Sequence, residues 1–386
     1  MTKRNARLLM GYTFAQCSLP LIAIAVPFYQ NQIGLTFQQF LMIEAIFAAT
    51  LVVMEVPSGW ISDLWTRKMT LAVGALLTSS GFFLLSTVDS LYEAIFCEIM
   101  VGMGVSLASG TVTALLYDDL LEHGRVSEFR RLEGKRHGFG FYVLAVSSLA
   151  GGLLYELNPY LPVLVSAAGY LIGVPCALLI KEPPRVKKAV ERNPFYDAVQ
   201  VMKYALRGHP EVAAIIFFVA SLFGGTLAGQ WTQQPYYMAM GLPEAWFGVF
   251  VATAYLIGGL GGQLGHLLEK RLRPMHILIG LWCVAILCWC VSAAFMWYHA
   301  FFLLMISNIA YGVGAPVMQD ALNKRVDSAR RATVLSVASL MIRITFIPLG
   351  LIIGWAAESY NIQVGILVLA GIVLVANLLN LRKINF

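Results

Sequence analysis

Four ionisable side chains stand inside long apolar stretches of the sequence, where a charge has few neighbours that could stabilise it: Glu44, Glu55, Glu98 and Arg343. A charged residue in a membrane-length apolar segment usually faces a bundle interior or a water-filled path, and it pairs with an opposite charge or exchanges a proton. The chemistry that these residue types offer is therefore proton uptake and ion pairing. We expect Glu98 or Glu44 to bind a proton, and Arg343 to respond to the charge of that carboxylate.

The elements that must position these residues are twelve apolar segments. The 386-residue chain is 59% hydrophobic and only 12% charged, whereas a soluble protein carries roughly 25% charged residues. Apolar runs of about 20 residues have the length of membrane-crossing helices rather than of barrel strands. We predict an all-α membrane protein with twelve spans, at 8–29, 39–62, 69–88, 91–116, 138–157, 160–180, 211–230, 245–268, 275–298, 300–319, 332–356 and 361–381.

The positions of the basic residues support this division. Every Lys and Arg except Arg343 falls before the first span or in a loop that follows an even-numbered span. The alternate loops contain neither residue: 30–38, 89–90, 158–159, 231–244, 299 and 357–360. Because positive residues stay on the cytoplasmic side of a membrane, both termini are predicted to be cytoplasmic.

Depth along the spans separates the possible partners of Arg343. At about 1.5 Å per residue, Glu98 lies about 10 Å and Glu44 about 7 Å from the outer ends of their spans, and Arg343 lies about 17 Å from the inner end of its own. Depth therefore favours Glu98 as the partner of Arg343, with Glu44 second. Glu55 stands near an inner end beside Pro57 and is assigned to a gate. A static ion pair that only fixes helix packing is the alternative.

One long hydrophilic stretch, about 181–210, divides the chain into an N-terminal bundle of six helices over 1–180 and a C-terminal bundle over 211–386. Within this linker, Asn193-Pro194 is typical of a helix start, and the apolar spacing that follows predicts a short amphipathic helix on the cytoplasmic surface. The halves also repeat each other. Gly59, Asp63 and Arg67-Lys68 recur, at an offset of 203 residues, as Gly262, His266 and Lys270-Arg271, as a duplicated unit would leave them.

The segment from Gly59 to Lys68 resembles the signature G-x-x-x-D-x-x-x-R-[RK] of the major facilitator superfamily, and it follows the second span as it does in that family. The stretches Glu55-Val56-Pro57-Ser58 and Leu116-Tyr117-Asp118-Asp119-Leu120 resemble one branch of the superfamily. The resemblance implies two pseudo-symmetric six-helix bundles that carry a substrate by alternating access. It also implies that spans two and eleven pack together, which brings Glu44 closer to Arg343.

Asp63 stands at a cytoplasmic helix end, where its carboxylate can meet the positive N-terminus of a neighbouring helix. By the resemblance that neighbour is span eleven, starting near Thr333, and the contact would hold the cytoplasmic side shut. Gly59 would let helices approach closely. A plain salt bridge in a loop is the alternative. The predicted cytoplasmic gate consists of Gly59, Asp63, Arg67, Lys68 and Glu55.

The substrate cavity is expected between the halves, near the middle of the membrane. The resemblance implies that the spans carrying the residues named below line this cavity. No cluster of intramembrane cations is present in the sequence to hold a phosphorylated compound, which favours an amphipathic or apolar substrate. Each lone amide in the set could instead join two helices by a hydrogen bond, an interpretation that we favour for Asn308. The candidate lining residues are Gln16, Gln230, Trp231, Gln234 and Asn308.

Two departures separate the chain from the drug–proton antiporter pattern. Glu98 stands where that pattern has the arginine of R-x-x-x-G-x-G. Of the pattern's second stretch, G-x-x-x-G-P-x-x-G-G, this chain has only the final part, which ends at Gly151-Gly152 and lacks the proline. The direction of transport therefore stays open. A membrane-embedded enzyme would need convergent carboxylates, and Asp118-Asp119 has no second motif of that kind.

The sequence thus predicts a secondary active transporter of the cell (inner) membrane that exports a small amphipathic compound, such as a drug or a secreted metabolite, in exchange for protons. Uptake symport or uniport of a small nutrient is the alternative, and a non-transporting receptor is a remote one. The expected partners are the small molecule, protons and the lipid bilayer. No nucleic acid, cofactor or metal ion is expected, and a monomer is compatible with the sequence.

Overall fold

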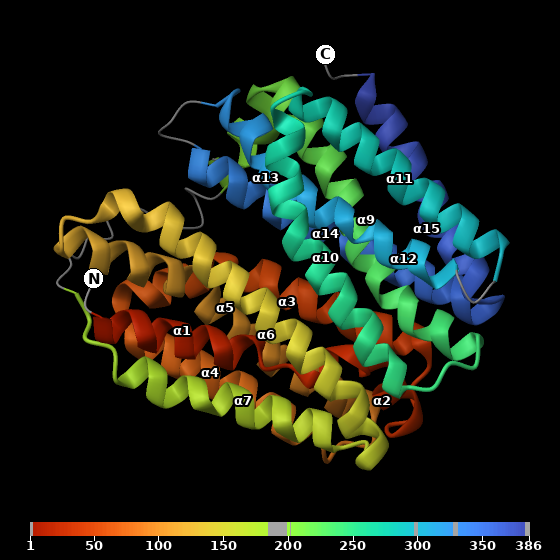
Figure 1. Ribbon diagram of the computed structural model, residues 1–386, viewed down its shortest axis with the longest axis horizontal. Coiled ribbons are helices and arrows are strands. Elements are labelled where there is room, and N and C mark those ends of the chain that lie inside the picture. The colour runs from red at the N-terminus through yellow and green to blue at the C-terminus, as the bar shows by residue number, and fades with distance from the viewer. Residues whose placement is uncertain (1–2, 184–198, 201, 297–299, 327–330, 383–386) are drawn as a thin grey trace. The chain divides into compact units, whose positions relative to one another are not determined.

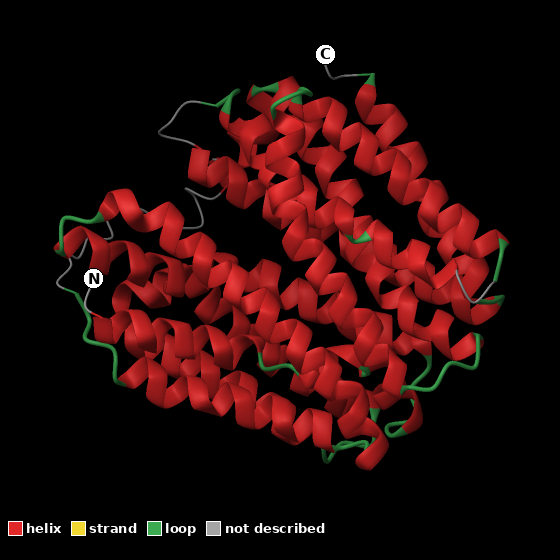
Figure 2. Ribbon diagram, viewed as in Figure 1, coloured by secondary structure: helices red, strands yellow, loops and turns green. Residues whose placement is uncertain are grey.

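The computed structural model describes residues 3–183, 199–200, 202–296, 300–326 and 331–382. Within these residues the secondary structure is helical and contains no strand (Figure 2). Ten helices are long and apolar enough to cross a membrane, and a bent helix pair near the N-terminus would be an eleventh span. The shorter apolar helix Ala245–Gly259 lies where the eighth span is predicted.

Two compact units divide the chain. Unit 1 comprises Met1–Gly34, Thr50–Pro194 and Glu244–Ala252, and unit 2 comprises Leu35–Ala49, Phe195–Pro243 and Thr253–Phe386. Two long helices, α3 (Phe37–Leu64) and α10 (Ala245–Glu269), therefore contribute residues to both units.

Unit 1 is built around α4, which packs along both α5 and α7 (Figure 1). Its core includes Tyr12, Leu71 and Leu115, each at most 1% exposed. Small residues let two of its helices approach closely: a Cβ atom on Gly104 of α5 would lie 2.5 Å from the carbonyl oxygen of Gly74 on α4. The helices of this unit, beside its parts of α3 and α10, are α1 (Lys3–Cys17), η1 (Pro20–Ala23), α2 (Ala25–Asn31), α4 (Arg67–Leu85), α5 (Leu91–Glu122), η2 (Val126–Glu128), α6 (Phe129–Leu157) and α7 (Leu161–Leu178).

The first span is broken, although the sequence analysis predicts one helix over 8–29. α1 ends at Cys17, and the chain turns by 54° before it continues as α2. Pro20 explains why α1 ends, because proline has no N–H to donate and keeps the preceding residue out of the helical conformation, while the 54° bend lies at Ile24, between η1 and α2. Leu19 accordingly has φ −127° and ψ 70°.

The fifth span begins earlier than predicted. The sequence analysis starts it at residue 138, but α6 begins at Phe129. Nine further residues are therefore helical, among them Glu133, Arg136 and His137. Hydropathy does not detect this part of the helix, because hydropathy identifies only the residues that contact lipid. The helix continues beyond them into a polar segment.

Unit 2 is built around α9. In its most apolar 18-residue stretch, 89% of the residues are buried. It packs against α12, α13, α14 and α15. The tenth predicted span consists of two helices that are interrupted at Asn308. The helices of this unit, beside its parts of α3 and α10, are η3 (Tyr204–Gly208), α9 (Pro210–Ala239), α11 (Pro274–Ala294), α12 (Ala300–Ser307), α13 (Ile309–Asn323), α14 (Arg331–Ser359) and α15 (Ile362–Leu381).

The predicted helix of the linker falls mainly outside the described residues, and so does its start at Asn193-Pro194. The described part is helical at residues 199–200 and 202–203 and continues as the π-helical turn Tyr204–Gly208. Pro210 then begins α9, a position where the missing N–H of proline costs no hydrogen bond.

Candidate functional site

The buried carboxylate of unit 1 is Glu98 on α5. Its side chain is 6% exposed, and the hydroxyl of Tyr29 on α2 donates a hydrogen bond of 2.6 Å to its Oε1. The ring of Tyr29 meets Phe28 edge to face, and Phe28 meets Tyr160 in the same way, each pair with centroids 5.9 Å apart. The bend of the first span thus gives Tyr29 a fixed place beside the carboxylate.

Glu98 has a hydroxyl rather than a cation as its partner in unit 1. Among the described residues of this unit, no Lys, Arg or His forms an ion pair with it. A buried charge is costly unless it is paired, while a hydroxyl can donate to a carboxylate or accept from a carboxylic acid. The pair with Tyr29 can therefore hold Glu98 in either protonation state.

The other two charges predicted to act in coupling belong to unit 2. Glu44 is on the part of α3 that lies in this unit, and Arg343 is on α14. Both side chains are half-buried, and both have interaction partners. Tyr311 of α13 lies within electrostatic range of the Arg343 guanidinium. Which carboxylate Arg343 pairs with stays a prediction.

The signature segment lines a polar hollow in unit 1, with a volume of about 260 Å³. One wall is α3 and the other is α5, and serine and threonine hydroxyls make up much of the surface between them. A Cβ atom on Gly59 would meet no described atom within 4 Å, so no described helix of unit 1 packs closely against this glycine. The lining residues are Glu55, Ser58, Gly59, Ser62, Asp63, Arg67, Ser106, Ser109, Gly110, Thr111 and Ala114.

The two sequence motifs of unit 1 meet through an ion pair. Nη2 of Arg67 lies 2.9 Å from Oδ2 of Asp118, and their side chains are 13% and 19% exposed. The backbone N–H of Arg67 also donates to Oε1 of Glu182 at 2.7 Å. Thr66 caps the N-terminus of α4 by accepting from Met69, so the position of Arg67 is fixed by its helix. Arg67 is thus a brace between α4 and α5.

Asp119, the second carboxylate of the motif, has a different partner. Its Oδ1 accepts a hydrogen bond of 2.8 Å from the amide of Asn5 on α1. The same amide group contacts both backbone groups of Lys181, donating to the oxygen at 2.9 Å and accepting from the nitrogen at 3.1 Å. Asp118 and Asp119 therefore tie α5 to its neighbours. In contrast, Asp63 is exposed, and among the described residues of unit 1 it forms no ion pair.

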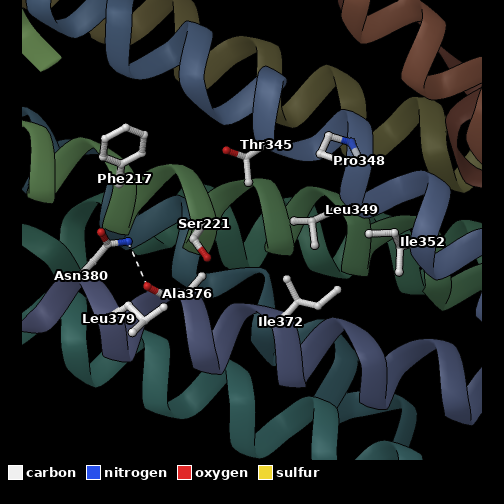
Figure 3. Close-up of a pocket in the computed structure, with 10 residues that line it drawn as sticks. All are labelled: Phe217, Ser221, Thr345, Pro348, Leu349, Ile352, Ile372, Ala376, Leu379 and Asn380. Carbon is white, nitrogen blue, oxygen red and sulfur yellow. Dashed lines mark hydrogen bonds between the residues drawn. The ribbon is translucent and has the colours of Figure 1, made fainter.

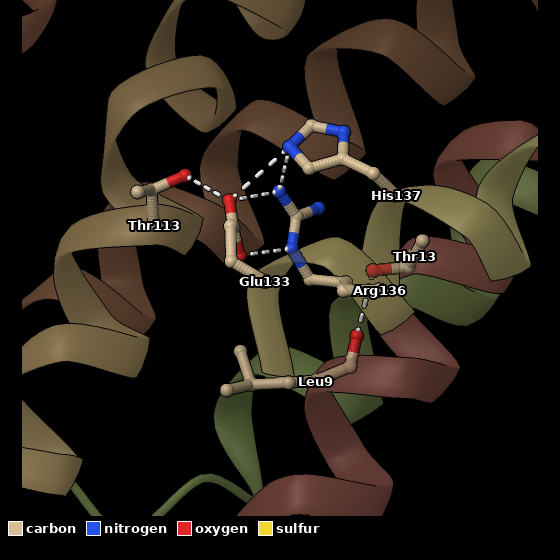
Figure 4. Close-up of polar contacts among 6 residues, drawn as sticks. All are labelled: Leu9, Thr13, Thr113, Glu133, Arg136 and His137. Atoms are coloured by element: carbon tan, nitrogen blue, oxygen red, sulfur yellow. Dashed lines mark hydrogen bonds and ion pairs between the residues drawn. The ribbon is translucent and has the colours of Figure 1, made fainter. Parts of the chain in front are cut away.

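A second charged network lies on the early turns of α6, where the sequence analysis expects a loop (Figure 4). Arg136 donates two hydrogen bonds to the carboxylate of Glu133, at 2.9 and 2.7 Å. Thr113 of α5 donates a third at 2.8 Å, and Nε2 of His137 lies 3.2 Å from the same carboxylate. The guanidinium charge of Arg136 is thereby balanced within its own helix.

Three of the predicted cavity residues lie close together in the sequence of α9. The amide of Gln230 donates to the hydroxyl of Tyr255 at 3.4 Å, and the ring of Trp231 meets that of Phe40 edge to face at 5.1 Å. Gln234 is 2% exposed and has an interaction partner. Gln16, half-buried near the end of α1, belongs to unit 1.

Gln233, which adjoins these candidates on α9, supports the break in span ten. The backbone N–H of Asn308 donates to Met305 rather than to Leu304. The carbonyl of Leu304 instead accepts from the side chains of Gln233, at 3.1 Å, and Ser307, at 2.6 Å. Nδ2 of Asn308 is buried and has no partner among the described residues, so the helix–helix bond that we favoured for this amide is not formed there.

Gln233→Leu should lower the free energy of unfolding by about 1 kcal/mol, because the carbonyl of Leu304 loses one of its donors. Thermal unfolding of the purified protein measures this change. Gln230→Leu is the matched variant on the same helix, since its bond is longer and its side chain is half-buried, and we expect it to have the smaller effect. A larger loss from Gln230→Leu would contradict the bracing role of Gln233.

Buried charges on long apolar helices, with a signature segment at a helix end, define a polytopic helical membrane protein. The model of the Major Facilitator Superfamily matches residues 8–344. The chain therefore belongs to this superfamily, and the predicted fold of twelve helices in two bundles is confirmed.

Similar proteins agree with this assignment. An uncharacterized MFS-type transporter of Bacillus subtilis (strain 168), YxaM, is 24% identical over 357 residues, which cover 88% of this chain and 86% of that protein. Crystal structures with the same fold include the nucleoside transporter NupG, at TM-score 0.75 and 16% identity, covering 99% of this chain and 99% of that one. Another is a POT family transporter in complex with 5-aminolevulinic acid, at TM-score 0.74 and 14% identity, covering 98% and 96%.

The superfamily determines the general class of activity. The chain is a secondary transporter and not an enzyme. It is a multi-pass membrane protein, which is consistent with the inner membrane of a bacterium.

Proposed function

We propose that this transporter exports a small amphipathic organic compound, such as a drug or a secreted metabolite, in exchange for protons, and that Glu98 is the proton-binding group. The observation that carries the proposal is the contact between Glu98 and Tyr29 at 2.6 Å. Glu98 is 6% exposed and has no cationic partner among the described residues of its own unit. A group in this setting can take up a proton in one state of the transporter and release it in another.

Arg343 and Glu44 complete the proposed coupling set. When alternating access brings a carboxylate close to a guanidinium, the charged form of the carboxylate is favoured and its proton leaves. When the two separate, the neutral form is favoured. Glu98 and Glu44 are both candidates for the carboxylate that meets Arg343, and the proposal keeps both.

The hollow at the signature segment is the proposed cytoplasmic gate. Asp63 is exposed at its edge, so its carboxylate is available to a helix N-terminus when the gate closes. We assign this role to the start of α14, which begins at Arg331, close to the predicted Thr333. Glu55 and Gly59 line the hollow, while Arg67 braces the same end of unit 1, and Lys68 follows it on α4.

The substrate class follows from the charges. Arg136 already has its carboxylate in Glu133, so this guanidinium adds no unbalanced charge that could hold a phosphorylated compound. The proposed lining comprises amides and one aromatic ring: Gln16, Gln230, Trp231, Gln234 and Asn308. Such a surface suits a compound with an apolar body and a few hydrogen-bonding groups.

Uptake of a small nutrient with protons is the second candidate. It is favoured by structural neighbours whose names describe a nucleoside transporter and a D-xylose–proton symporter. Their sequence identities to this chain are 16% and 14%. Their names therefore serve only to select test compounds. The direction of proton movement distinguishes export by exchange from uptake by symport.

The experiment is flux in proteoliposomes with an imposed proton gradient, using a panel of amphipathic cations and neutral metabolites that includes nucleosides. Glu98→Gln keeps the shape of the side chain but cannot bind a proton, and we expect it to lower gradient-driven flux by about 100-fold, the scale on which a positioned proton-transfer group acts. Tyr29→Phe removes only the hydroxyl and should shift the pH at which flux is half-maximal while flux persists. Glu44→Gln tests the other carboxylate in the same assay.

Export by exchange predicts proton movement opposite to that of the compound. Movement in the same direction would replace export by symport and leave the role of Glu98 in place. If both Glu98→Gln and Glu44→Gln transport with undiminished dependence on the proton gradient, neither carboxylate couples. Compounds that cross without any proton movement would make the protein a uniporter with structural buried charges.

A further inference from the structure

A groove on unit 2 is separate from all the residues discussed above (Figure 3). Its volume is about 430 Å³, and three helices line it: α9, α14 and α15. All three are membrane spans by length and composition. The lining residues are Phe217, Ser221, Thr345, Pro348, Leu349, Ile352, Ile372, Ala376, Leu379 and Asn380.

The groove exists because small residues stand where the three helices meet. Ser221 of α9, Thr345 of α14 and Ala376 of α15 line its middle (Figure 3), and none of them reaches far across it. Pro348 of α14 also lines the groove and has no backbone N–H to donate within its helix.

The lining offers an occupant apolar contact and little hydrogen bonding. The hydroxyl of Thr345 donates a hydrogen bond to the backbone carbonyl of Met341 at 2.8 Å. The side-chain amide of Asn380 donates to the backbone carbonyl of Ala376 at 3.0 Å. Ser221, the third polar residue, is 5% exposed. In contrast, apolar side chains stand exposed along the groove, with Leu379 55% exposed. An acyl chain fits such a lining better than a polar solute does.

Basic residues adjoin, along the chain, the helix ends at one end of the groove. Phe217 and Asn380 mark this end (Figure 3); it lies toward the first residue of α9 and the last residues of α15. Arg382 directly follows α15, and Lys203 and Arg207 precede α9; all three are exposed. The acid in the first turn of α9, Glu211, is already paired with Arg325 at 2.8 Å.

We propose that this groove binds one acyl chain of an anionic phospholipid of the surrounding bilayer, and that the headgroup phosphate lies against Arg382 and Arg207. By the distribution of basic residues, this end of unit 2 is the cytoplasmic one. That leaflet carries anionic headgroups, which attract basic residues near the membrane surface. The inference is independent of the transported compound, since it concerns a lipid site on unit 2.

Native mass spectrometry of the delipidated full-length protein tests the proposal, with phosphatidylglycerol and phosphatidylcholine of the same acyl chains as probes. We expect phosphatidylglycerol to bind more tightly. Ala376→Trp fills the middle of the groove and should weaken its binding by about tenfold, because the acyl chain loses its apolar contacts there. Arg382→Gln should weaken it by about fivefold, since one basic residue near an anionic headgroup contributes about that factor, and should leave phosphatidylcholine binding unchanged.

Matched variants make the result specific. Val375→Trp adds the same side chain at the neighbouring position of α15, which is 57% exposed and does not line the groove. Arg131→Gln removes the same charge from an exposed position in unit 1. Ala376→Leu gives a smaller filling side chain if Ala376→Trp does not fold. Equal binding by the Ala376 and Val375 variants would overturn the groove as the site, and equal binding of the two lipids would overturn the headgroup preference.

Discussion

Gly104→Ala is expected to lower the melting temperature of the purified transporter, because α4 and α5 leave no room for a methyl group between them. The added Cβ would lie 2.5 Å from the backbone oxygen of Gly74 and would also overlap the hydroxyl of Thr78. Backbone atoms cannot rotate away as a side chain can, so the helices must separate. Overpacking costs about 1–3 kcal/mol, and the larger Gly104→Leu is expected to prevent accumulation of folded protein.

Gly110→Ala is the control for this prediction. It adds the same methyl group further along α5, where no described atom lies within 4 Å of the new Cβ. Alanine is about 1 kcal/mol more favourable than glycine inside a helix, so the melting temperature should stay or rise. Thermal unfolding in detergent, followed by intrinsic fluorescence, measures both variants. Melting temperatures that fall equally would contradict the close approach of α4 and α5 at Gly104.

Asp118→Ala should destabilise unit 1 by about 2 kcal/mol, because it removes the carboxylate that lies 2.9 Å from Nη2 of Arg67 in a mostly buried place. The two side chains are 13% and 19% exposed. Arg67→Ala should cost a similar amount. The double variant should cost less than the sum of the two single variants, since both single variants remove the same contact. Chemical or thermal unfolding of the four proteins gives the coupling energy directly.

Arg131→Ala is the comparison for this cycle. Its ion pair with Glu128 is shorter, at 2.6 Å, but the arginine is 65% exposed. Exposed pairs of this kind contribute less than about 1 kcal/mol. If Asp118→Ala were no more destabilising than Arg131→Ala, the brace between the two motifs would contribute nothing to stability, whatever its geometry.

The number, type and approximate bounds of the spans could be predicted from the sequence, because a helix that crosses the membrane needs about 20 consecutive, mostly apolar residues. The end of α1 just before Pro20 also had a local signal, since proline disturbs its own helix. The early start of α6 had none that hydropathy could use. Residues 129–137 look like a basic loop, and only the contacts of Glu133 with Arg136 and Thr113 show how charged residues are stabilised there.

Partners distant in the sequence were harder to predict. Both motifs of unit 1 were recognised, but nothing in either indicates that Arg67 pairs with Asp118, which is far from it along the chain. The sequence predicts a cation as the partner of Glu98, whereas its partner in unit 1 is the hydroxyl of Tyr29. A depth argument could have found it, since Tyr29 stands at the outer end of the first predicted span and Glu98 near the outer end of the fourth.

The interruption at Asn308 also bears on how the chain enters the membrane during synthesis. It divides the tenth span into helices of 8 and 15 residues, which reach the roughly 20 residues needed to cross the hydrocarbon core only when taken together. The segment Phe302–Asn323 has the lowest mean hydropathy of the ten long spans, 1.3. A nascent chain that ends at this segment would gain little by leaving the translocon for lipid. The tenth span is therefore expected to partition into the bilayer together with the more apolar helices on either side of it.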